Sequence, residues 1–264
     1  MIKKFFKKDI IIFVIGLALV CYPIVSNFIE NSSYHDLIKT YEDEVNNLDD
    51  EKKQQIINTA NDWNEALYLK QQGLSVNDQN NYESILNINN GIMGSIEIPK
   101  IDVNLPIYHG TSDDILNIGT GHVEDSSMPI GGINTHTVIT GHSGLPSAKL
   151  FTRLDELEEK DIFYIYILDE VLAYEIDKIE VVLPENANYQ IEDGKDLATL
   201  VTCTPYGINT HRLLVTGHRI PYKQSVKDKI RKNLPSNHEL IIYAIPLVFI
   251  VLGIIIFKKK GAKK

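Results

Sequence analysis

One cysteine and one arginine are spaced in this chain as acyl-transfer chemistry would require. Cys203 ends the apolar run TLVTC, and Arg212 lies nine residues later in HRLLVTG. A thiolate attacks carbonyl carbon, and a guanidinium donates hydrogen bonds to the oxyanion that results. If Thr199 to Cys203 and Arg212 to Thr216 are neighbouring antiparallel strands, the two side chains face each other across the pair. The alternatives are a buried inert cysteine and a surface ion pair.

A cysteine nucleophile also needs a proton carrier, and histidine is the side chain whose ordinary pKa lies nearest neutrality. The chain has eight histidines. His142, in VITGHSGLP, directly follows an apolar run and a glycine, so it is expected to project from the edge of a sheet. His136 and His211 are its main rivals, and spacing alone leaves the choice among the three open.

Both ends of the chain predict membrane-spanning helices. Residues 10–29 are mostly apolar and follow lysines, and residues 240–257 are apolar and precede lysines. About 20 apolar residues cross a hydrocarbon core, and lysines favour the cytoplasmic side. We therefore expect both tails in the cytoplasm and the middle of the chain outside. The alternatives are a cleaved signal peptide at the N-terminus and a wall-attachment tail at the C-terminus, although LPSNH at 234–238 lacks the Thr and Gly of such a signal.

Charge and cysteine count narrow the function of the exported part. The whole chain carries a net charge of −9, and removing the terminal lysines makes the middle more acidic, which argues against nucleic acid as a partner. Cys21 lies in the first apolar segment, so it is not available to form a disulfide with Cys203. Thiols outside cells are usually paired, which makes an unpaired one a candidate nucleophile.

The elements that would position these residues are helical first and then β-rich. Residues 31–72 carry apolar side chains near a 3.6-residue period, which predicts helix. From Gly94 onward, short β-branched runs alternate with Gly, Pro, Asn and Asp, which predicts a closed or sandwiched mainly β domain. Ser147 to Asp161 is expected to be a helical insert because Leu150, Leu154 and Leu157 have helical spacing.

The combined motifs resemble the sortase family. TLVTC ending in Cys203, TGH ending in His142 and the arginine nine residues after the cysteine match the sortase signature in order. CTPYGINTHRLLV and TGHSGLPSAKLFTRLD resemble class C, the pilus-assembling sortases of Gram-positive bacteria. The resemblance spans about Met93 to Tyr222.

The resemblance implies roles for three residues. Cys203 would attack the Thr–Gly carbonyl of an LPxTG-like sorting signal and form a thioester. His142 would protonate the leaving amine and deprotonate the incoming one, and Arg212 would stabilise the oxyanion and position the substrate. The acceptor would be a lysine amine of a pilin subunit. Because one amide replaces another, the chemistry requires no cofactor, metal or ATP.

The resemblance also implies an organisation of the chain around a closed sortase-type β-barrel with short helices. We expect a cytoplasmic tail at 1–9, a transmembrane helix at 10–29, an extracellular helical region with a possible lid at 30–92, the catalytic barrel at 93–222, a linker at 223–239, a transmembrane helix at 240–257 and a basic cytoplasmic tail at 258–264.

Three other activities remain open from the sequence. They are a wall-anchoring sortase that uses a peptidoglycan cross-bridge amine, a thiol hydrolase that releases surface proteins, and an inactive module that only binds sorting signals. Retention of Cys203, His142 and Arg212 together argues against the last.

Class C sortases commonly carry an Asp-Pro-aromatic lid, and the corresponding stretch here, Leu67 to Leu86, contains no Asp-Pro pair. Asp78 is followed by Gln79, and the nearby aromatic residues are Tyr68 and Tyr82. Because the segment from Gly73 to Asn81 is polar, we expect any lid to be weakly held and Cys203 to be open to solvent.

Overall fold

The computed structural model describes residues 2–76, 81–88, 91–145, 147–235 and 237–262, and these fall into two compact units. The larger unit holds Ser32–Leu145 and Lys149–Asn233. The smaller unit holds the two ends of the chain. The residues predicted to do chemistry all belong to the larger unit.

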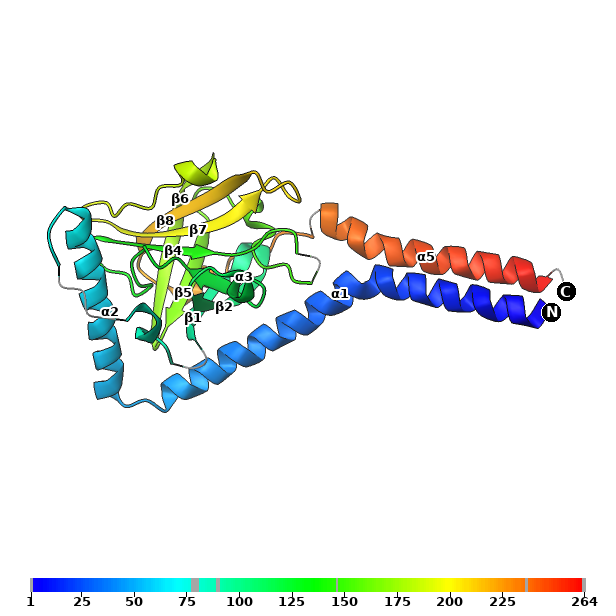
Figure 1. The fold of residues 1–264 in the computed structure, drawn as a ribbon, viewed down its shortest axis with the longest axis horizontal. Helices are drawn as coiled ribbons and strands as arrows, with labels where there is room; N and C mark the ends of the chain where they lie inside the picture. Colours follow the sequence, from blue (N-terminus) through cyan, green and yellow to red (C-terminus); the bar gives the residue numbers. More distant parts are fainter. Residues whose placement is uncertain (1, 77–80, 89–90, 146, 236, 263–264) are drawn as a thin grey trace. The chain divides into compact units, whose positions relative to one another are not determined.

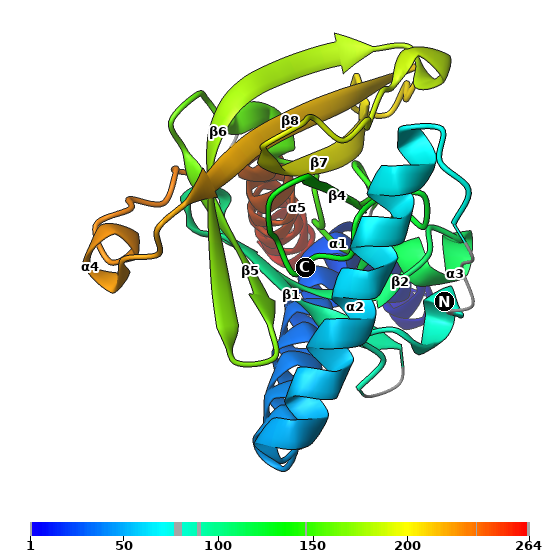
Figure 2. The same ribbon diagram turned by 90° about the vertical axis from the view of Figure 1, so that its left-hand side faces the viewer.

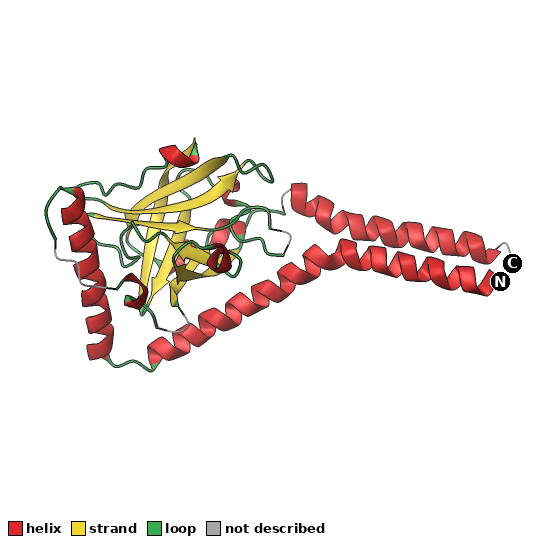
Figure 3. Ribbon diagram, in the orientation of Figure 1, coloured by secondary structure: helices red, strands yellow, loops and turns green. Residues whose placement is uncertain are grey.

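The larger unit is built on eight strands that close into a barrel in the order β1-β2-β3-β4-β7-β8-β6-β5 (Figure 3). The predicted closed β-barrel is therefore confirmed. The strands are β1 Ile92–Ile98, β2 Val103–His109, β3 Thr120–His122, β4 Thr135–Thr140, β5 Ile162–Ile167, β6 Glu170–Val182, β7 Asp196–Thr204 and β8 His211–Ile220.

Two strand pairings in this barrel are parallel, and one of them matters for the site. β4 runs parallel to β7 with Thr135 opposite Asp196 and Thr140 opposite Val201. β7 in turn pairs with β8 as an antiparallel neighbour. Ile139, Leu200 and Val215 alternate with the outward-facing residues and are fully buried, as expected for the interior of a small barrel. β4, β7 and β8 therefore form one continuous sheet face.

The helices are α1 Ile2–Asn46, α2 Asp50–Gln71, α3 Asp113–Leu116, α4 Gln224–Lys227 and α5 Asn237–Ala262 (Figure 1). The last turns of α1 bury the side of the helix that the periodicity predicted. Tyr41 and Val45 pack with Ile92 and Tyr108. The Tyr41 hydroxyl donates to the Met93 carbonyl at 2.9 Å and accepts from Leu168 N at 2.9 Å. Burial raises the pKa of Tyr41 to about 12, so the hydroxyl stays protonated.

α2 lies beside the barrel (Figure 2) and is fixed to it by polar contacts near the starts of β4 and β7. The Asn64 side chain is buried and bonds both backbone groups of Met128, accepting from N at 2.6 Å and donating to O at 3.2 Å. At the end of the helix, Tyr68 and Gln72 donate to the Asp193 carboxylate, three residues before β7 begins.

Two helices of the described residues are long and apolar enough to cross a membrane, over Ile10–Asn46 and Glu239–Ile256. The first includes the predicted span 10–29, and the second covers the predicted span 240–257 up to Ile256. The sequence analysis ended the first transmembrane helix at residue 29, whereas α1 continues without interruption to Asn46. No glycine follows Gly16 within α1 and Pro23 is its only proline, so the sequence after residue 30 contains no helix breaker. The side of the membrane on which each tail lies remains a prediction.

The expected helical insert at 147–161 is wrong in its secondary structure. The described residues there form turns and a short 3₁₀ helix, Leu154–Glu156. Leu150, Leu154 and Leu157 are all buried, so their spacing reflects packing on the barrel. Leu150 has a φ of 41°, a left-handed conformation that an α-helix does not accommodate.

Candidate active site

Cys203 and Arg212 lie directly opposite each other on β7 and β8. The predicted pairing of these strands is therefore confirmed. Directly opposite residues of an antiparallel pair project from the same face, so the thiol and the guanidinium share one face. Both residues are partly exposed.

His142 reaches the same end of the sheet from β4. Thr140 pairs with Val201, and the ladder continues because Gly141 N donates to the Val201 carbonyl at 3.1 Å. His142 lies two residues beyond Thr140, as Cys203 lies two residues beyond Val201. β4 ends at Thr140, so His142 lies in the loop directly after it. Continuing the parallel register by two residues predicts that His142 lies near Cys203, which pairs with Arg212.

The rival histidines have other surroundings. His136 is buried within β4, where its Nδ1 contacts the Gln190 carbonyl at 2.9 Å and its Nε2 contacts Thr199 Oγ1 at 2.7 Å. Burial lowers its pKa, which favours the neutral ring. His211 pairs with Thr204, one position along from Cys203 and Arg212, and therefore alternates to the other face. These placements favour His142 among the three.

Two hydrogen bonds hold the backbone at Gly141 and His142. Thr202, directly before Cys203, donates its buried hydroxyl to the Gly141 carbonyl at 2.7 Å. On the other side, Phe151 N donates to the His142 carbonyl at 3.0 Å. A Cβ at Gly141 would lie 2.9 Å from the Phe151 ring, which is fully buried. The glycine of the TGH motif therefore permits this close approach.

The guanidinium of Arg212 is anchored to its own loop. Its Nη1 donates to the His211 carbonyl at 3.1 Å and to the Asn209 carbonyl at 3.4 Å. Tyr189, in the connection between β6 and β7, lies near it. Burial raises the pKa of Tyr189, and the positive charge of Arg212 partly offsets that rise. The guanidinium has further donors beyond Nη1 that can serve a substrate oxygen.

An apolar surface continues from the row of candidate residues along the same face. Val201 lies two residues before Cys203, and Leu214 lies two residues after Arg212, so all four share a face. Val201, Leu214 and Val138 form a buried cluster. Partly buried side chains that pack against it come from several elements: Val123, Val182, Ala187 and Tyr189.

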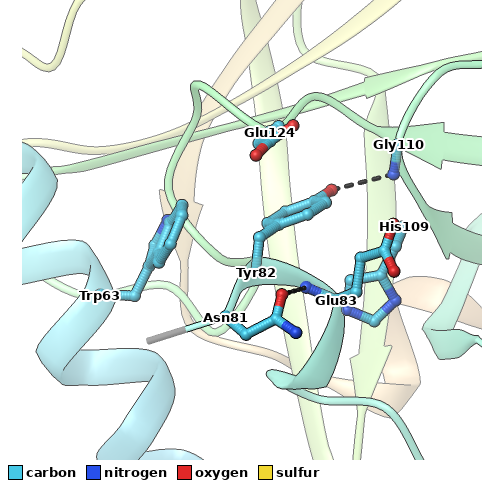
Figure 4. Close-up of a pocket in the computed structure, with 7 residues that line it drawn as sticks. All are labelled: Trp63, Asn81, Tyr82, Glu83, His109, Gly110 and Glu124. Carbon is cyan, nitrogen blue, oxygen red and sulfur yellow. Dashed lines mark hydrogen bonds between the residues drawn. The ribbon is translucent and has the colours of Figure 1, made fainter. Parts of the chain in front are cut away.

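A separate cavity of about 430 Å³ lies where the lid-like stretch rejoins the barrel (Figure 4). Its lining residues are Trp63, Asn81, Tyr82, Glu83, His109, Gly110 and Glu124. Tyr82 is almost fully buried, and its hydroxyl accepts from Gly110 N at 2.9 Å and contacts His122 Nδ1 at 3.0 Å. The cavity contains none of the predicted site residues.

The expected lid lies partly outside the described residues, since Asp78 and Gln79 are among residues 77–80. Among the described residues on either side, Tyr68 contacts the turn before β7, and Tyr82 contacts β3 and the end of β2. Asp196 to Cys203 of β7 spans about 23 Å at 3.3 Å per residue, so Tyr68 is tied near the end of β7 remote from the thiol. Open access to Cys203 stays a prediction.

Several residues that frame the site carry no chemistry of their own, and the sequence analysis did not single them out. Thr202, Phe151, Thr152 and Tyr189 hold loops or cover the apolar face. The sequence around Thr202 does not indicate this role, because the hydrogen-bond partner of its hydroxyl, Gly141, is 61 residues away in sequence. Within the described residues, no group of three or more His, Cys, Asp or Glu side chains is arranged to hold a metal.

Comparisons with known proteins show which family the barrel resembles. The sortase domain model matches residues 96–220. Sortase D of Bacillus subtilis is 33% identical over 131 residues, which cover 48% of this chain and 63% of that protein. Sortase C1 of Streptococcus agalactiae has a solved structure that is 45% identical, with a TM-score of 0.66, and the match covers 71% of this chain and all of that one. A Clostridium perfringens sortase C, solved with the C-terminal cell wall sorting motif, is 44% identical with a TM-score of 0.64 and matches over 71% of this chain and 99% of its own.

Proposed function

The chain belongs to the sortase family, within class C, and we propose that it is a cysteine transpeptidase that joins pilin subunits. The observation that carries this proposal is the opposition of Cys203 and Arg212 on β7 and β8, next to the end of the parallel strand β4, two residues before His142. A nucleophile, a proton carrier and an oxyanion donor at one edge of a sheet are the parts that acyl transfer requires.

The first half of the reaction forms the acyl-enzyme. The Cys203 sulfur attacks the carbonyl carbon of Thr in an LPxTG-like sorting signal, and Arg212 stabilises the oxygen of the tetrahedral intermediate. The C–N bond to Gly then breaks, His142 gives its proton to the departing amine, and a thioester remains on Cys203. The apolar face around Val201 and Leu214 is suited to the apolar side chains of such a signal.

The second half transfers the acyl group. A lysine amine of a neighbouring pilin attacks the thioester carbonyl, neutral His142 takes the proton that the amine loses, and the C–S bond breaks to release the Cys203 thiolate. The product is an isopeptide bond. A thioester makes this exchange possible because it holds the acyl group in a form that an amine intercepts.

We also propose that the enzyme works as a two-pass membrane protein. The apolar parts of α1 and α5 would span the membrane, with both tails in the cytoplasm and the barrel outside. The lysines at both ends of the sequence support this orientation.

The test uses the full-length chain in detergent with a fluorescent LPxTG-containing peptide. Mass spectrometry should detect a thioester on Cys203 and, when a pilin or a lysine-containing peptide is added, an amide-linked product. Cys203→Ala should form neither. Cleavage that yields only the free acid in the presence of amines would indicate a hydrolase, and product formed solely with cross-bridge peptides would indicate wall anchoring.

A further inference from the structure

We propose that Tyr206 is a positioning residue, whose ring holds the loop of His142 against the loop of Cys203 through contact with Gly144. The inference rests on the proposed function for its catalytic consequence. Tyr206 follows Cys203 by three residues, and Gly144 follows His142 by two. The contact therefore joins the two loops directly beyond the residues proposed to react.

The contact is close enough to require a glycine. A Cβ at Gly144 would lie 3.2 Å from Tyr206 Cε2 and 3.5 Å from both Cδ2 and Cζ. Gly144 also has a φ of +82°, a region that favours glycine. Its N donates to Thr152 Oγ1 at 3.0 Å, which fixes the backbone on which the ring rests.

This contact lies just beyond the point where the hydrogen bonds between β4 and β7 end. The hydrogen-bonded link between β4 and β7 ends with Gly141 and Thr202. Past that point, the His142 carbonyl bonds to Phe151 of its own loop. The Tyr206 ring supplies a contact from the β7 side to the loop beyond His142. The ring thereby adds to the bond from Thr202 to Gly141 as a second link between the segments that carry thiol and imidazole.

Because the Tyr206 ring is half exposed, its main contribution is not to the stability of the fold. Tyr206 is 49% exposed, so removal of its ring forfeits only part of the burial free energy of an aromatic side chain. A displacement of about 1 Å between reacting groups can cost about 100-fold in rate. Loss of the ring is therefore expected to affect the reaction more than the fold.

The test measures Cys203 alkylation and transpeptidation in the full chain, with Cys21→Ser in the background so that one thiol remains. His142→Ala should slow alkylation by iodoacetamide at neutral pH, because the imidazole assists thiolate formation. Tyr206→Ala should slow it in the same direction and lower kcat by about tenfold with a smaller change in KM. Tyr206→Phe, which keeps the ring, should restore most of both rates.

Dependence on His142 is the decisive readout. In the His142→Ala background, Tyr206→Ala should slow alkylation no further, because it acts through a side chain that is already gone. Equal slowing in both backgrounds would overturn the proposal, as would a Phe variant as slow as the Ala variant.

Two glycines in these loops separate the contact from backbone strain. Gly144→Ala should slow both reactions by displacing the ring, which also tests the proposal if Tyr206→Ala does not fold. Gly207→Ala is the matched control, because its φ is +73° and nothing lies within 4 Å of its Cβ position. Equal losses in both glycine variants would also overturn the proposal. If the parent chain alkylates but forms no transpeptidation product, the proposed function fails while the alkylation comparison still decides the role of Tyr206.

Discussion

At the scale of single residues, the proposed site combines a small nucleophile, Cys203, with His142 and Arg212, two side chains whose shape few other residues can reproduce. Cys203 and His142 require particular atoms within reach of each other, whereas Arg212 contributes a planar set of donors. One of its nitrogens is occupied by backbone carbonyls of its own loop. These bonds orient the guanidinium, and in the proposed reaction such preorganisation would lower the cost of reorganisation in the transition state.

The first prediction is that Arg212→Lys lowers kcat/KM for transpeptidation by about 100-fold, which is the typical cost of removing one oxyanion donor. An ammonium keeps the charge and loses the planar fork. The measurement is the initial rate of product formation with the peptide and amine described above. Arg231→Lys, at an exposed position after β8, is the matched control and should keep the parental rate. Parental activity in Arg212→Lys would show that the arginine has a structural role.

At the scale of elements, the barrel positions the site, and buried polar groups fix α2 and the segment around Tyr82 to it. Asn64 on α2 satisfies both backbone groups of Met128. His122 on β3 is fully buried, with Nε2 against the Ser127 carbonyl at 2.9 Å and Nδ1 against the Tyr82 hydroxyl. Each such group stabilises the fold only while its partners are in place.

Asn64→Ala should destabilise the larger unit by about 1–3 kcal/mol, because it leaves the buried Met128 N–H unpaired, whereas the Met128 carbonyl keeps its bond from Ile130 N at 2.8 Å. Trp63, the only tryptophan of the chain, lies next to Asn64 and reports the unfolding by its fluorescence. The control is Asn58→Ala on the same helix, where the side chain is exposed and should cost about 0.5 kcal/mol or less. Equal unfolding midpoints for the two variants would contradict the role given to Asn64.

His122 should make stability depend on pH in the acid range. Burial lowers its pKa to about 4, below the ordinary 6.5, so the fold holds the neutral ring. As pH falls below 6.5 the unfolded chain binds a proton that the folded chain does not, and stability is lost until pH approaches 4. The expected contribution is a loss of about 2 kcal/mol between pH 7 and pH 5.

The measurement is the free energy of unfolding at these two pH values for the parent and for His122→Gln, which does not titrate. Whatever its stability at pH 7, the variant should lose about 2 kcal/mol less than the parent on acidification. Asn58→Ala, which removes no titratable group, should keep the parental slope. A variant at position 122 with an unchanged slope would show that another group causes the pH dependence.

At the scale of the whole molecule, the charges at the two ends are the basis for a prediction about topology. Lysines flank both apolar segments on their terminal sides. Protease added to intact, wall-stripped cells should therefore digest the barrel and spare tags fused to either terminus. Immunoblotting of both tags measures this. A tag at the C-terminus that disappears under protease would place that end outside and exclude the two-pass arrangement.

The sequence by itself determined the residue types of the site, the barrel class and the two apolar ends. These features depend on local composition and period, which can be read within a window of about 20 residues. The opposition of Cys203 and Arg212 was also within reach, because a hairpin fixes the register of strands that are close in sequence.

Spacing alone left the choice among three histidines open, and only the tertiary structure supplies the strand pairing that favours His142. That choice depends on the parallel pairing of β4 with β7 and on the bond from Thr202 to Gly141, whose partners are 61 residues apart. Pairing between strands so far apart in sequence depends on how the whole barrel closes, and no short stretch of sequence specifies it. The same dependence on the whole barrel explains why the helix predicted at 147–161 is wrong. The leucines there have helical spacing, but they are buried in turns and a short 3₁₀ helix.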